Sequence, residues 1–369
     1  MLHRLLRPWL LIPLATLLLL GLGLWPLLGT GSVFLKRMET AEATAGTFTL
    51  EDAPVPLPNG TQLAADLYRP AGRVRRVVVL AHGVHHLGRR EPRLTRYARE
   101  LARAGSLVLV PDLPDLMAYE LTPRTLDHLE AAVRHLAAFP ARERRHKRVQ
   151  LHGISFAGGL SLCVAGRPAL KDQVGAVFAF GAHGDLDGVM RFLASGPRPG
   201  GDVPPPHPYG QAVVMRTLAE HLVPAAEVAP FRSALLLFLQ ERHEAFRAAV
   251  AVLPEASRRV ANLVVAWKPE AVAEVLRPLA SRIQGDPALS PLRQAAPPCP
   301  VFLLHGRGDS VIPASETRAL GAWALGKAPV MWLVSDRIGH VELQKPPQGL
   351  GRMVSTFQLL RFWTALLRV

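Results

Sequence analysis

The stretch from Arg148 to Gly159, RVQLHGISFAGG, constrains the fold of this chain more than any other. Its apolar start at 149–151 predicts the end of a buried strand, because the apolar run stops abruptly near a glycine. Residues 152–159 then predict a sharp turn into a helix at 160–164. A serine at the tip of such a strand–turn–helix unit has an exposed hydroxyl, and the N–H of the next residue faces any oxyanion that forms. Ser155 is therefore a candidate nucleophile.

This stretch resembles the Gly-x-Ser-x-Gly nucleophile elbow of the α/β-hydrolase superfamily, with Gly153 and Ser155 in the matching positions. It departs from the motif at Ala157, where the second glycine usually stands. Alanine adds only a methyl group there, and two glycines follow. A motif this short also arises by chance between small residues. The rest of the chain must therefore supply a base, an acid and donors for the oxyanion.

Apolar, β-branched runs alternate with helical patterns along the chain. Strands are expected at 74–80, 107–110, 149–151, 174–180, 301–304 and 330–334, and helices at 94–104, 123–136 and 356–367. A hairpin around the Asn59-Gly60 turn is expected to precede them, within 47–70. Alternation of this kind predicts an α/β fold with a mostly parallel central sheet and helices on both faces.

The pattern changes between residues 188 and 298, where a Pro/Gly-rich loop and several helical stretches appear without a strand pattern. We interpret this segment as a helical cap, inserted between the two strands that precede the acid loop. The core would then comprise 47–187 and 299–369. The cap stretch 233–239, SALLLFL, indicates either an apolar substrate or packing on the core, and the sequence leaves both open.

The acid and the base are expected in the loops after the last two strands. Asp309 lies in HGRGDSVIP, which resembles the acid loop of the superfamily, and His340 follows Gly339 as the superfamily's base does. Ser155, Asp309 and His340 also occur in the chain order of that superfamily. Asp185 and Asp187 follow the preceding strand, where some members place the acid, and they are the competing candidates.

The oxyanion donors are expected to be the N–H groups of Phe156 and Val84. Phe156 follows the nucleophile, and Val84 lies in His82-Gly83-Val84, which matches the HG-x motif of the superfamily. His85 and His86 are candidate substrate-binding residues at the pocket mouth. We predict no metal and no cofactor, because no carboxylate or cysteine spacing accompanies these histidines.

The N-terminal segment 1–37 is expected to be a membrane anchor or a signal segment. Pro8 to Gly29 carries no charge, and about 22 apolar residues suffice to span a bilayer. Arg4 and Arg7 favour a cytoplasmic N-terminus, although Lys36 and Arg37 weaken that orientation. We expect the catalytic domain to be exported, periplasmic or otherwise extracytoplasmic, and to be secreted if the segment is cleaved.

Charge and cysteine content exclude other classes of protein. The net charge is +14, and the one dense basic run, 142–148, has no accompanying aromatic stripe. It is typical of a solvated loop, so no nucleic-acid partner is expected. The two cysteines, Cys163 and Cys299, are expected to be buried thiols rather than a disulfide.

These residues together predict a serine hydrolase that cleaves carboxylic esters or thioesters of small, hydrophobic acyl substrates. The stretches HGVHHLGRREPRL, PDLPDL, GISFAGG and GAHGDL also resemble a group of bacterial membrane-associated hydrolases of unknown substrate. An acyltransferase or a peptidase with the same triad remains an alternative, as does a catalytically silent, membrane-tethered binding protein.

Overall fold

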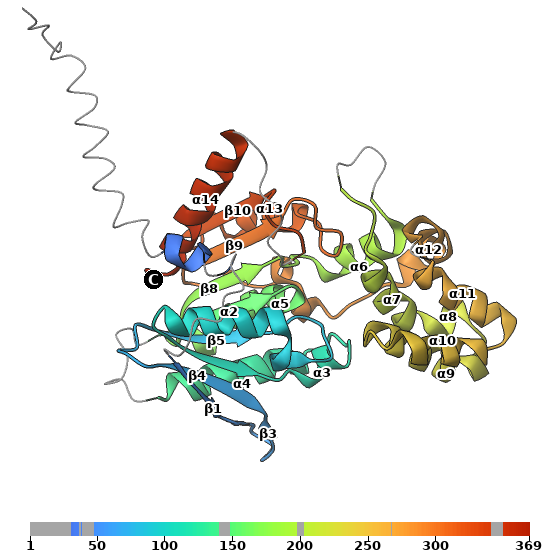
Figure 1. The fold of residues 1–369 in the computed structure, drawn as a ribbon, viewed down its shortest axis with the longest axis horizontal. Coiled ribbons are helices and arrows are strands. Elements are labelled where there is room, and N and C mark those ends of the chain that lie inside the picture. The colour runs from blue at the N-terminus through green and yellow to red at the C-terminus, as the bar shows by residue number, and fades with distance from the viewer. Residues whose placement is uncertain are drawn as a thin grey trace, which may run out of the picture.

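An eight-stranded sheet forms the centre of the molecule in the computed structural model, which describes residues 31–36, 38, 48–139, 148–197, 203–266, 268–340 and 350–369 (Figure 1). In spatial order its strands are β1 (Phe48–Asp52), β4 (Ala65–Pro70), β6 (Ser106–Pro111), β5 (Arg76–Ala81), β7 (Val149–Ile154), β8 (Val174–Phe180), β9 (Val301–Gly306) and β10 (Val330–Ser335). β1 and β4 pair antiparallel with their neighbours, and all the other pairs are parallel. The short pair β2 (Val55–Pro56) and β3 (Gln62–Leu63) flanks the expected Asn-Gly turn.

Helices cover both faces of the sheet. The helices on one face are α2 (Pro92–Arg103) and α14 (Leu350–Leu366), and those on the other are α4 (Arg124–Ala137), α5 (Phe156–Ala165) and α13 (Ser315–Ala324). Alternate residues of β5 enter the two apolar clusters, Val77 and Val79 on the α5 face and Val78 and Leu80 on the α2 face. A strand covered on both faces reads as a continuous apolar run for this reason.

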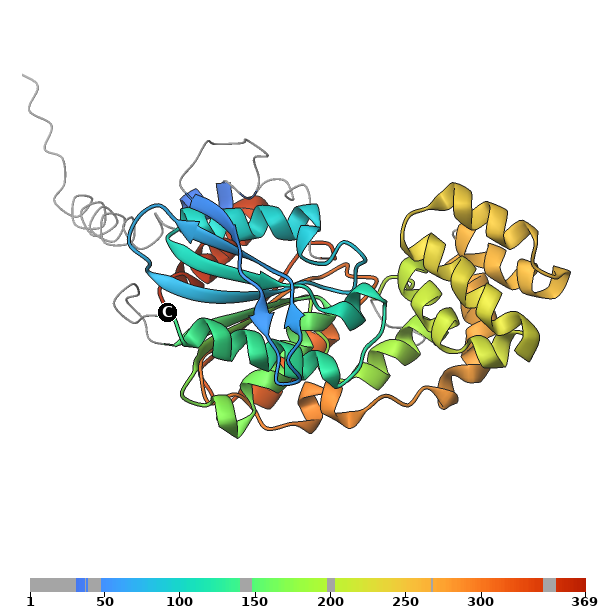
Figure 2. The ribbon, with the colours of Figure 1, turned by 90° about the horizontal axis from the view of Figure 1, so that it is seen from below.

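Between β8 and β9 the described residues form helices and the loops that join them, with no strand. The helices are α6 (Leu186–Ser195), α7 (Pro208–Thr217), α8 (Ala219–Leu222), α9 (Val228–Leu239), α10 (His243–Ala251), α11 (Glu255–Val265) and α12 (Pro269–Leu276). Those from α7 to α12 form a lobe at one end of the sheet (Figures 1 and 2). The mostly parallel sheet, its two helical layers and this inserted cap confirm the α/β-hydrolase fold that the motifs implied.

The apolar stretch 233–239 lies within α9 and packs inside the cap. Ala234, Leu235, Phe238 and Leu239 are buried there. The Phe238 ring lies 5.5 Å from that of Phe246 on α10. The sequence left open whether this stretch contacts an apolar substrate or packs against other residues, and packing accounts for its buried side chains.

Most of the expected membrane anchor, including Pro8–Gly29, lies outside the described residues, as does most of the basic run at 142–148. Within the described part, no helix combines the length and the apolar character needed to cross a bilayer. The described end of the segment, 31–36, is a short helix on the core, where Phe34 and Leu35 are buried. Cys163 and Cys299 are buried free thiols, as expected.

Candidate active site

Ser155 lies at a sharp turn between β7 and α5. Its backbone has a φ of 57° and a ψ of −132°, a region that residues other than glycine rarely adopt. A Cβ on Gly153 would lie 2.3 Å from the carbonyl oxygen of Ala157 and 2.5 Å from Ser161 Oγ, so only glycine fits there. The buried methyl group of Ala157 is accommodated where the superfamily usually has glycine.

The structure brings Ser155, His340 and Asp309 together from the ends of β7, β10 and β9. Ser155 Oγ lies 3.1 Å from His340 Nε2, and His340 Nδ1 lies 2.8 Å from Asp309 Oδ2. A His340 that donates its Nδ1 proton to the carboxylate leaves the Nε2 lone pair free to accept the Ser155 proton. These are the distances that proton transfer from a serine to a histidine requires.

Asp309 is buried and fully engaged as an acceptor. Its Oδ1 accepts from the N–H groups of Val311 at 2.8 Å and Ile312 at 2.9 Å, and its Oδ2 also lies 3.2 Å from His305 Nε2. Burial raises the pKa of Asp309, but the adjacent His340 and the hydrogen bonds from His305 and His340 outweigh it and hold the pKa well below its usual range. Asp309 is therefore an anion throughout the neutral pH range.

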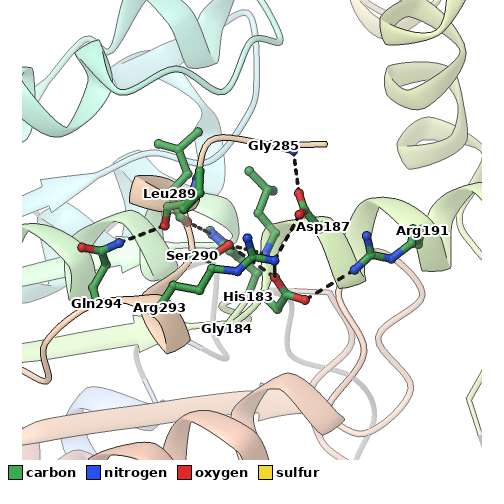
Figure 3. A network of polar contacts seen from close by, with 12 residues as sticks. His183, Gly184, Asp187, Arg191, Gly285, Leu289, Ser290, Arg293 and Gln294 are labelled. Atoms are coloured by element: carbon green, nitrogen blue, oxygen red, sulfur yellow. Dashed lines mark hydrogen bonds and ion pairs between the residues drawn. The ribbon is translucent and has the colours of Figure 1, made fainter. Parts of the chain in front are cut away.

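The competing carboxylates, Asp185 and Asp187, belong to a different network, at the base of the cap. Figure 3 shows Asp187 in this network. Asp187 Oδ1 accepts from the N–H of Gly285 at 2.7 Å. Arg293 bridges the two carboxylates, with Nη2 3.4 Å from Asp185 Oδ1 and 3.2 Å from Asp187 Oδ2. Both carboxylates thus join the chain that enters the cap to the chain that leaves it.

Phe156 and Val84, which are expected to supply the oxyanion donors, both line the cavity that contains Ser155. Phe156 is the first residue of α5, and the N–H at that position has no partner within its own helix. The loop that carries Val84 touches the nucleophile, because a Cβ on Gly83 would lie 3.2 Å from Ser155 Cβ. His82 Nδ1 donates to the carbonyl of Gly83 at 2.7 Å and its Nε2 accepts from Leu113 at 2.9 Å. Burial lowers the pKa of His82 to about 4, so a neutral imidazole holds this loop.

His85 and His86 stack on each other with ring centroids 4.5 Å apart. His85 lines the cavity above Ser155, whereas His86 lies outside that lining and its Nδ1 contacts the Tyr119 hydroxyl at 3.0 Å. Burial, followed by the neighbouring His86, lowers the pKa of His85. Of the two expected substrate-binding residues, His85 is therefore the one placed at the cavity wall.

The cavity that contains Ser155 has a volume of about 980 Å³ and lies between the core and the cap. Sequence analysis missed two residues of its wall, His207 and Tyr209, which begin cap helix α7. Tyr209 donates its hydroxyl to the carbonyl of Val84 at 3.0 Å. Burial lowers the pKa of His207, as does the nearby His340. No local motif marks either residue, because only the folded cap brings them to the site.

No group of metal-ligating side chains occurs among the described residues.

No family model and no curated protein matches the sequence. Solved structures of similar shape include the esterase Pf2001 of Pyrococcus furiosus, with 14% identity, coverage of 86% of this chain and 88% of that one, and a TM-score of 0.46. A hyperthermophilic esterase of Pyrobaculum calidifontis has 13% identity, 93% and 91% coverage and a TM-score of 0.47. Brefeldin A esterase, described as a bacterial homologue of human hormone-sensitive lipase, has 15% identity, 93% and 82% coverage and a TM-score of 0.46.

Proposed function

We propose that this chain is a serine hydrolase that cleaves carboxylic esters or thioesters through an acyl-enzyme intermediate. The observation that carries the proposal is the hydrogen-bonded series from Ser155 Oγ to His340 at 3.1 Å and from His340 to Asp309 at 2.8 Å. A serine in a strained turn at the floor of a large cavity, next to a histidine that an anion orients, is the arrangement that nucleophilic acyl chemistry requires.

In this mechanism Ser155 Oγ attacks the substrate carbonyl carbon while His340 Nε2 accepts its proton. The C–O bond of the ester breaks as His340 returns that proton to the leaving alcohol or thiol, which leaves an ester on Ser155. Water then attacks this ester by the same proton transfers and releases the acid. Asp309 fixes the Nδ1–H tautomer of His340 and stabilises the imidazolium.

The oxyanion of each tetrahedral intermediate would be bound by the N–H groups of Phe156 and Val84. Phe156 also opens α5, and the N-terminus of a helix favours negative charge. Each such donor contributes roughly 3–4 kcal/mol to the stability of the transition state. The substrate is expected to be a small, hydrophobic ester, because apolar side chains provide much of the cavity wall.

Two alternatives use the same fold. An acyltransferase or a peptidase would form the same acyl-enzyme and differ in the nucleophile or in the bond cleaved, and competing alcohols or peptides in the assay separate these outcomes. A silent binding protein would keep the fold without turnover. The hydrogen-bonded Ser155 and His340 favour catalysis over silence.

We also propose that segment 1–37 tethers the protein to a membrane, with the catalytic domain exported. The support is the uncharged stretch Pro8–Gly29 in the sequence. Cell fractionation and protease accessibility in intact cells test this location. The intact mass of the mature protein shows whether the segment is cleaved and the enzyme secreted.

The experiment that tests the activity is labelling with a fluorophosphonate together with hydrolysis of p-nitrophenyl esters. It uses the full chain in detergent, because Phe34 and Leu35 belong to the buried core. Labelling and turnover should be present in the wild type and lost in Ser155→Ala and His340→Ala. A matched Ser310→Ala variant, which changes another serine of the cavity wall, should keep both. A folded wild type that neither reacts with the fluorophosphonate nor hydrolyses the esters would favour the binding-protein alternative.

A further inference from the structure

The cavity continues past Ser155 to a second apolar wall on the side of the sheet away from the cap. On the cap side its wall includes Leu193 and Val213. Leu193 belongs to the apolar cluster that contains α5, and Val213 packs against that cluster. On the other side its wall comes from the cluster that contains α2 and α14. We call this second part the distal arm, and its lining residues are Leu35, Met38, Leu94, Tyr97 and Trp363. Ser155 thus lies where two apolar walls meet.

The N-terminal helical residues 31–36 and 38 contribute Leu35 and Met38 to the wall of the distal arm. Both views show this helix (blue) beside α14 (red), far from the cap lobe (Figures 1 and 2). The Phe34 ring lies 4.9 Å from that of Trp363 and 6.1 Å from that of Tyr97. A Cβ on Gly31 would lie 2.3 Å from Thr364 Oγ1, so the helix approaches α14 closely. Packing therefore fixes Leu35 and Met38 at the cavity wall.

Two polar side chains of this wall, Tyr97 and Arg337, are hydrogen-bonded within the protein. The Tyr97 hydroxyl lies 2.9 Å from His152 Nδ1, to which it donates, and Arg337 Nη1 donates to Thr356 Oγ1 at 2.9 Å. Arg96 also lines the cavity, but its side chain is exposed, so it lies at the rim. Leu35, Met38, Leu94 and Trp363 carry hydrocarbon side chains apart from the thioether and the indole N–H, so the wall of the arm is mainly apolar.

We propose that the distal arm binds a linear hydrocarbon chain of the ester substrate, and that Leu35 and Met38 set how long a chain is accepted. This rests on the proposed ester hydrolysis at Ser155. A flexible, unbranched chain suits an arm that begins at the nucleophile and is lined by Leu35, Met38, Leu94 and Trp363. The arm is also distinct from the cap, whose apolar stretch 233–239 packs inside the cap.

Substrates with chains of graded length test the proposal in the full-length protein. One series varies the acyl chain of p-nitrophenyl esters from acetate to decanoate, and the other varies the alcohol chain of alkyl acetates. Activity is expressed per active site titrated with the fluorophosphonate. In one of the two series kcat/KM should rise with length by about fourfold per buried methylene, and that series identifies which side of the ester enters the arm.

Variants of the N-terminal helix then locate the chain. Met38→Trp fills the arm and should lower the ratio of long-chain to short-chain kcat/KM by about fifteenfold, the loss expected when two methylenes no longer fit. Leu35→Ala enlarges the arm and should shift the preferred chain to greater length. Val33→Trp is the matched control, because Val33 is on the same helix, is 51% exposed and is absent from the cavity wall.

A length preference that stays unchanged in both Met38→Trp and Leu35→Ala, while the protein still labels at Ser155, would overturn the distal-arm proposal alone. So would a wild type whose kcat/KM does not rise with length in either series. Absence of labelling in the folded wild type would instead overturn the proposed hydrolase function. The two failures are therefore distinguishable in one set of assays.

Discussion

Tyr209, at the start of cap helix α7, donates its hydroxyl to the carbonyl oxygen of Val84 at 3.0 Å. Val84 is the residue whose N–H is proposed to bind the oxyanion, so a cap side chain holds the peptide next to that donor. His82 holds the same loop from the core side through its bonds to Gly83 and Leu113. The cap therefore helps to position the proposed oxyanion site as well as to cover it.

Tyr209→Phe should lower kcat by about tenfold and leave KM within about twofold, because a misaligned donor loses stabilisation mainly in the transition state. Steady-state kinetics with a short p-nitrophenyl ester measure both constants. Tyr68→Phe is the control, since Tyr68 lies on β4 outside the cavity wall. A change in KM alone would mean that Tyr209 contacts the substrate and does not position the loop.

The buried histidines make the fold sensitive to acid. Burial lowers the pKa of His152 to about 3, and those of His82 and His183 to about 4. An unfolded histidine has a pKa of about 6.5. Between that value and the folded value the unfolded state binds more protons, so stability falls as the pH drops, by up to about 1.4 kcal/mol per pH unit for each histidine. The free energy of unfolding should therefore decrease from pH 7 to pH 4.

His152→Gln isolates one of these contributions. His152 Nδ1 accepts from Tyr97, and its Nε2 lies 3.1 Å from Gln150 Oε1. A glutamine amide offers one acceptor and a donor in the same place but does not titrate. Unfolding of this variant should take up about one proton fewer in acid, so the slope of the unfolding free energy against pH should be shallower by up to about 1.4 kcal/mol per pH unit. Denaturant titrations at several pH values give the slope, and parallel curves for wild type and variant would refute the assignment.

The elbow depends on glycine at position 153 and tolerates a side chain at position 157. Gly153→Ala places a methyl group 2.3 Å from the carbonyl oxygen of Ala157 and should destabilise the protein by at least about 2 kcal/mol. Ala157→Gly is the matched control, and it should cost only about 0.5–1 kcal/mol, as glycine does within a helix. Thermal unfolding compares them, and equal losses would contradict the steric argument.

Local sequence signals predicted the fold and the three central side chains, because each lies in a short loop at the end of a strand. No local sequence signal predicted that Tyr209 would contact Val84 or that Leu35 would line the cavity. Tyr209 follows a Pro/Gly-rich loop and reaches Val84 only through the fold of the cap. The segment 31–36 follows an apolar stretch that resembles an anchor, and its contact with Trp363 joins the two ends of the chain. The last helix was expected to start at Thr356, whereas α14 begins six residues earlier, at Leu350.

The position of the carboxylates separates a catalytic role from a structural one. Asp309 contacts His340 directly at 2.8 Å, whereas Asp187 accepts from the Gly285 N–H and pairs with Arg293. Asp309→Asn keeps the shape of the side chain but stops it from stabilising the imidazolium, and it favours the wrong tautomer of His340. We expect kcat to fall by about 10⁴-fold, the loss typical of such a replacement.

Asp187→Asn should change kcat by less than about threefold, because Asp187 contacts Gly285 and Arg293 at the base of the cap rather than His340. It should instead loosen the junction of the cap, which hydrogen exchange measures at residues 285–293. Steady-state kinetics of both variants decide between the two acids. Wild-type activity, expressed per site that the fluorophosphonate labels, is the reference. A large loss of kcat in Asp187→Asn with activity retained in Asp309→Asn would identify Asp187, just after β8, as the catalytic acid. The observed contact of Asp309 with His340 would then have to form without contributing to the reaction.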